Sequence, residues 1–152
     1  MTKNGIHTLD ETLQVANQWL KELNLAMGWD DGNRSYRLLR ATLHALRDRL
    51  PAHEAVHLGA QLPMLIRGLY YDGWQMRESP SSERSRDAFL AHIEAAFKQD
   101  PNADPEALVR KVFAFLAGKI SAGEIGDVKH VLPPDIRALW PIEAAGKLAG
   151  IH

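Results

Sequence analysis

The residues with the clearest potential for chemistry are the string HEAVH at positions 53–57, which fits the zinc-peptidase pattern H-E-x-x-H. On a helix, the two histidines of this pattern point the same way and bind one zinc ion, while the glutamate acts as general base on the zinc-bound water. A third protein ligand completes such a site. The extended pattern asks for glycine and histidine where this chain has Ala60 and Pro63, and the more distant Glu78 lies in a polar segment.

The elements that would position this string are predicted to be helices. Pro51 is placed to begin a helix and Pro63 to end it, because proline suits a first helical turn and breaks an interior one. Apolar residues recur before it at spacings of three and four, which is typical of helices with one buried face. One stripe comprises Leu9, Leu13, Ala16, Leu20, Leu23 and Met27, and the next comprises Tyr36, Leu39, Leu43, Leu46 and Leu50.

The second half of the chain predicts further helices over residues 88–97, 105–120, 121–130 and 134–140. No segment shows the alternation of apolar and polar residues that is typical of strands. We therefore expect an all-α fold.

The two halves also align with each other at a constant shift of 70 positions, which places residues 40–70 over residues 110–140. Matches along the whole segment at one shift indicate a tandem repeat. We expect two pseudo-repeated helical units, of about three to four helices each, packed into one globular body. The first unit spans residues 1–76, a polar linker spans 77–86, the second unit spans 87–142, and a C-terminal tail spans 143–152.

The repeat bears on the zinc pattern, because it aligns Glu54 with Glu124. Ser121 and Glu124 have the spacing of a capping box, in which a glutamate in the first helical turn bonds to a free N–H group. His53 and His57 align instead with glycine and aspartate. The shared acid is interpreted as a helix-capping residue, and the two histidines as a pair that binds zinc or nickel adventitiously if it binds metal at all.

Several longer strings carry a resemblance to a known family. The segment from QWLKELNLAMGWDDGN to HLGAQLPMLIRGLYYDGW, followed by SRDAFLAHI and LPPDIRALW, resembles the bacterial domain-of-unknown-function family 2267. The resemblance covers nearly the whole chain. It implies a compact all-helical protein and implies no reaction, cofactor or catalytic residue. In that family's pattern the position of His53 is often acidic or otherwise polar, which counts against a zinc site that needs both histidines.

A cluster of residues typical of binding surfaces follows the zinc-like string. Arg67, Tyr71, Asp72 and Trp74 gather at a helix end, and arginine and aromatic side chains dominate protein interfaces. The repeat favours a structural role for Arg67, which aligns with an arginine. The other three have no counterpart in the second half and are therefore the better candidates for a surface site, although tryptophan also seals joints between packed units.

A third candidate is a row of basic side chains, Arg37, Arg40 and Arg47, on one side of a helix. Such a row could bind phosphate groups, but it is more often a solvated face with acidic neighbours. The net charge of −1 gives no general attraction for nucleic acid. Nucleic-acid binding is therefore not expected.

Composition adds weaker limits. The absence of cysteine excludes disulfides and thiolate metal sites and suits a reducing compartment. Neither a signal peptide nor a membrane span is visible, so a cytoplasmic location is expected. Because the familiar enzyme signatures and cofactor motifs are absent, we expect a non-catalytic interaction or adaptor module without a cofactor, which binds an unknown protein or itself. The alternative is small-ligand binding or catalysis in the groove between the two units.

Overall fold

A computed structural model describes residues 6–100 and 102–142 of this chain. The helices are α1 (His7–Met27), α2 (Gly32–Asp48), α3 (Ala52–Ala60), α4 (Met64–Tyr71), α5 (Arg86–Ala95), α6 (Pro105–Lys119), α7 (Ala122–Val131) and α8 (Pro134–Arg137), with a 3₁₀ turn at Met76–Glu78. No strand occurs in the described residues, and the expected all-α class is confirmed. Among the helices described, none is both long and apolar enough to cross a membrane.

The helix ends follow from local chemistry. The Asp31 side chain accepts hydrogen bonds from two backbone N–H groups at the start of α2, and Ser85 and Asp104 cap α5 and α6 in the same manner. These bonds satisfy N–H groups that have no partner within the helix. At the other end of α1, Gly28 adopts the left-handed conformation (φ 73°) that ends many helices.

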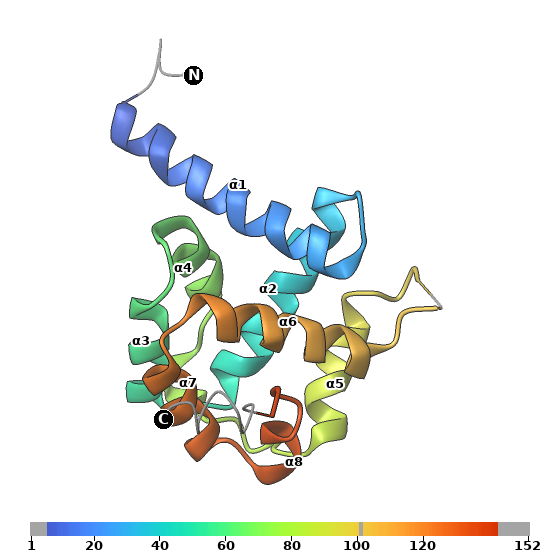
Figure 1. Ribbon diagram of the computed structural model, residues 1–152. Coiled ribbons are helices and arrows are strands. Elements are labelled where there is room, and N and C mark those ends of the chain that lie inside the picture. The colour runs from blue at the N-terminus through green and yellow to red at the C-terminus, as the bar shows by residue number, and fades with distance from the viewer. Residues whose placement is uncertain (1–5, 101, 143–152) are drawn as a thin grey trace, which may run out of the picture.

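The body is built around α6, which Figure 1 shows running through its middle (Figure 1). Helices α1, α2 and α5 all pack against α6, and α2 also packs against α5. One continuous apolar core results, and its side chains come from both halves of the chain. Phe113 of α6 illustrates this core, because it is fully buried and stacks on Trp140 with ring centroids 4.0 Å apart.

Two expectations about buried stripes need correction. Ala16, Leu23 and Met27 of α1 are buried as predicted, but Leu9 and Leu13 are exposed by 57% and 52%. Tyr36, at the head of the second stripe, is also exposed, because the stripe of α2 is covered only from Leu39 onwards. Periodicity identifies the face of a helix that is apolar, but how far a neighbour covers it depends on tertiary packing. The C-terminal tail, 143–152, lies outside the described residues.

Candidate functional site

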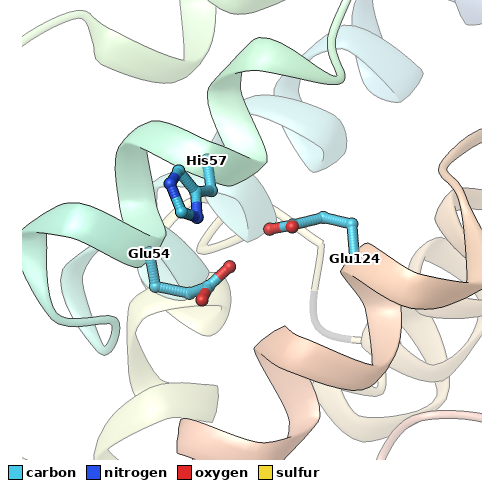
Figure 2. A group of neighbouring side chains, drawn as sticks. All are labelled: Glu54, His57 and Glu124. Carbon is cyan, nitrogen blue, oxygen red and sulfur yellow. The ribbon is translucent and has the colours of Figure 1, made fainter.

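The most unusual polar group of the structure lies where α3 packs against α7. Glu54 is in the first turn of α3 and Glu124 in the first turn of α7. Each carboxylate projects into the space between the helices, and His57, one turn after Glu54, borders the same space (Figure 2). One donor atom from each of the three side chains lies within 4.8 Å of the other two. We call these residues the α3–α7 cluster.

Both glutamates of the cluster are buried residues. Glu54 is 6% exposed and Glu124 is 9% exposed, and in each residue the Oε2 atom is buried without a hydrogen-bond partner. Burial, with a further contribution from the neighbouring Glu54 carboxylate, raises the pKa of Glu124 to about 8. The close approach of Glu54 favours the protonated form of Glu124, whereas two ionised carboxylates in this space would carry a free-energy cost.

The predicted capping role of these glutamates is wrong. Ser121 does accept a hydrogen bond from the Glu124 backbone N–H, at 3.2 Å, but the Glu124 side chain does not return one. The Ser121 N–H donates instead to the Gln61 side chain, also at 3.2 Å. Glu54 provides no cap for α3, which has no side-chain cap bond. The side chains of Glu54 and Glu124 therefore lie close to each other and do not bond to the N–H groups at the start of their own helices.

The structure separates the two histidines of the zinc-like string. His57 belongs to the α3–α7 cluster, whereas His53 does not. Both rings are exposed and lie with centroids 6.2 Å apart. Glu54, between them in sequence, is buried toward α7. The string thus places one histidine and the glutamate at a common site, which differs from the peptidase arrangement of two histidine ligands and an acid acting as base.

The Arg67 side chain makes hydrogen bonds to backbone groups. Its guanidinium donates to the Gly59 and Leu62 carbonyl oxygens at 2.9 and 2.8 Å, which satisfies the end of α3. Arg137 donates likewise to Lys129 and Leu132, at 2.8 and 3.0 Å. Arg67 is therefore occupied within the fold at the position where a binding surface was expected.

The aromatic residues after α4 pack inward. Tyr71 and Trp74 are half-buried and stacked, with ring centroids 5.5 Å apart. The Tyr71 hydroxyl lies against the backbone of α3 at Gly59, where even an added methyl group would clash with it. Asp72 is exposed and pairs with Arg40 at 3.3 Å. The segment from Tyr71 to Trp74 consequently joins α4 to α3, with Asp72 as its most accessible side chain.

The basic row on α2 is not one accessible surface. Arg47 is 4% exposed and donates to the Tyr70 and Asp72 carbonyl oxygens at 2.8 and 3.0 Å, and its Nε bonds to Asp48. Arg37 is exposed and lies over the Phe97 ring. The structure therefore brings two of the three guanidinium groups to the surface and buries the third as a structural donor.

A separate cavity of about 700 Å³ opens between the end of α2, residues 73–83 and α5. Arg49 and His92 line it, and burial lowers the pKa of each. None of Arg67, Tyr71, Asp72 and Trp74 belongs to its lining. The acidic residues Asp48, Glu78 and Glu83 lie among the same walls, so the cavity has no single sign of charge.

Comparison with known proteins gives a family but no activity. The family model for the uncharacterized conserved proteins of DUF2267 matches residues 16–139. No curated protein matches the chain. The matched span contains the whole α3–α7 cluster and most of α1.

Proposed function

The chain belongs to the DUF2267 family, and we propose that it is a non-catalytic interaction module that self-associates through the first half of α1. The observation that supports this proposal is a set of exposed apolar side chains, Ile6, Leu9 and Leu13, exposed by 65%, 57% and 52%. Figure 1 shows the first turns of α1 standing clear of the other helices (Figure 1).

The uncovered residues continue a stripe that is buried further along the same helix. Ala16, Leu23 and Met27 have the helical spacing of Leu9 and Leu13, and they are 7%, 0% and 8% exposed. The first half of α1 therefore has the composition of a core-facing helix, but no neighbour within residues 6–100 and 102–142 covers it. Apolar surface of this kind is typical of sites that bind another protein.

A second copy of the chain is the partner that this surface fits most simply. Around a two-fold axis the same patch serves both chains, so one contact covers each exposed leucine in both copies. Full burial of a leucine side chain contributes about 1.5–3 kcal/mol. Two or three such residues per chain can offset the entropy cost of association, and the expected dimer is weak rather than obligate.

The proposal is tested by the oligomeric state of the full chain. Leu13→Glu places a charge in the proposed contact, and Leu25→Glu is the matched control because Leu25 is 73% exposed on the same helix but lies off the stripe. Sedimentation equilibrium should show a concentration-dependent dimer for the wild type and for Leu25→Glu, and a monomer for Leu13→Glu. A wild type that stays monomeric at high concentration, or a dimer that both variants weaken equally, would refute the proposal.

We also propose that the chain is a tandem of two related units. The support is the pair Arg67 and Arg137, which donate to carbonyl oxygens eight and five residues before themselves in both halves. A crystal structure tests this, because superposition of residues 40–70 on residues 110–140 should bring the two guanidinium groups into register. Superposition that needs a different shift for each helix would contradict a duplication.

A further inference from the structure

We propose that Glu54, His57 and Glu124 form a binding site for one divalent transition-metal ion between α3 and α7. This site is independent of the contact proposed for α1, because it lies on other helices. Figure 2 shows the three side chains converging from the two helices (Figure 2).

Burial is the first argument. As whole residues, both glutamates are more than nine-tenths buried, and each has a buried Oε2 atom with no hydrogen-bond partner among the residues that the structure describes. Most buried polar atoms in proteins are hydrogen-bonded, and two acids in one low-dielectric space repel each other when ionised. A cation between them would provide both the missing partner and the opposite charge.

Among residues 6–100 and 102–142, no cationic side chain is paired with either acid. Arg67, on the adjacent helix α4, donates to the Gly59 and Leu62 carbonyl oxygens, and Arg137 donates to the backbone at the end of α7. None of the described salt bridges includes Glu54 or Glu124. The acids therefore face one another and an imidazole, which is itself a metal ligand.

The donor set indicates the class of metal. Two carboxylate oxygens and one imidazole nitrogen suit Zn²⁺, Mn²⁺, Fe²⁺ or Co²⁺, whereas Ca²⁺ and Mg²⁺ prefer oxygen ligands throughout. In the structure the three donor atoms lie within 4.8 Å of one another. To bind one ion, each of them must come to about 2.0–2.2 Å from the metal, so the donors must move closer together. Side-chain rotation can supply this movement. His57 lies at the exposed edge, so water can fill the remaining coordination positions.

The site differs from a zinc-peptidase centre in the role of its glutamate. Glu54 is a ligand here rather than a general base, and a residue 70 positions away, Glu124, replaces the second histidine. A bound ion would connect α3 to α7 and thus one half of the chain to the other. We assign it the role of a cross-link between these helices and no hydrolytic step.

Calorimetric titration of the full chain, without an affinity tag, with Zn²⁺ at neutral pH tests the site. The wild type should bind one equivalent. Glu124→Gln keeps the size of the side chain and removes a ligand charge, so it should weaken binding by at least the roughly 10–100-fold that the loss of even an outer-shell partner costs. His53→Gln is the matched control and should leave the affinity within about twofold, because His53 is not one of the three donors.

Thermal unfolding supplies a second measurement on the same proteins. Zn²⁺ should raise the Tm of the wild type and of His53→Gln but not that of Glu124→Gln. An ion raises the Tm only of a protein whose folded state binds it. Absence of saturable binding by the wild type would overturn the proposal. So would a His53→Gln variant that loses as much affinity as Glu124→Gln, because the histidine pair would then be chelating the metal adventitiously. Circular dichroism confirms that each variant is folded.

Discussion

Two buried charged groups of this protein have opposite surroundings. Arg47 of α2 is 4% exposed, and its guanidinium donates to two backbone carbonyl oxygens and to Asp48. Glu54 and Glu124 are buried to a similar degree, but each retains an unpartnered oxygen. The hydrogen bonds of Arg47 stabilise the fold, whereas the unpartnered oxygens of the two glutamates are the observation on which the proposed metal site rests.

The largest effect that this comparison predicts is at Arg47. Arg47→Met keeps an unbranched stem but leaves the Tyr70 and Asp72 carbonyl oxygens without their donor, so we expect the free energy of unfolding to fall by about 3 kcal/mol. Urea unfolding followed by circular dichroism measures this. Arg40→Met is the control, because the exposed Arg40–Asp72 pair should contribute less than about 1 kcal/mol. Equal losses in the two variants would break the distinction.

An intermediate effect is expected at Arg67 and Arg137, which are less buried than Arg47 but make the same kind of bond. Methionine at either position removes two donors from the end of a helix, where water can partly replace them, so a loss of about 1–2 kcal/mol is expected. The same unfolding assay measures both variants. Similar losses would support equivalent roles in the two halves. A loss of unfolding free energy at Arg67 alone would show that these hydrogen bonds stabilise only the first half of the chain.

The smallest effect is expected at Glu124, with the opposite sign. Its pKa is raised to about 8 by burial and by Glu54, with a contribution from Asp127, so the folded state holds a proton that the unfolded chain releases near pH 4.5. Without metal, the contribution of the Glu124 proton to the free energy of unfolding should be fully present below pH 4.5. It should be lost as the pH rises to about 8. His57 also lies at the cluster, but it is present both in the wild type and in the Glu124→Gln variant, so it does not contribute to the difference between them.

Glu124→Gln removes this titration and should be more stable than the metal-free wild type by the order of 1 kcal/mol near pH 8. Urea midpoints between pH 5 and pH 8, measured with a chelator present, test the difference in slope. Parallel curves for the two proteins would mean that water or a hydrogen bond already satisfies the buried acid.

Much of the fold could be predicted from the sequence, because the longer helices carry an apolar stripe and a proline, glycine or capping residue at one end or both. Glu54 and Glu124 show where this approach fails. Their alignment at a shift of 70 was visible, and so was the serine cap at Ser121, but the direction of a side chain after the first helical turn depends on which helix packs beside it. The packing of α3 on α7 turned both acids toward each other.

The same limit applies to the predicted surface residues. Arg67 and Arg47 are of a residue type that is common at binding sites. In the fold, however, both guanidinium groups donate hydrogen bonds to backbone carbonyl oxygens of other segments. Conversely, Leu9 and Leu13 read as core residues and are exposed. Residue type and spacing determine what a side chain can do, whereas the neighbour it meets is a tertiary property.

The central position of α6 has a consequence for synthesis of the chain. Helices α1 and α2 pack against α6, which begins at Pro105, so the ribosome makes more than two thirds of the protein before this surface exists. At the usual rates of elongation, apolar faces of the early helices stay uncovered for several seconds. We therefore expect a chain that terminates before α6 to expose these apolar faces and to be aggregation-prone.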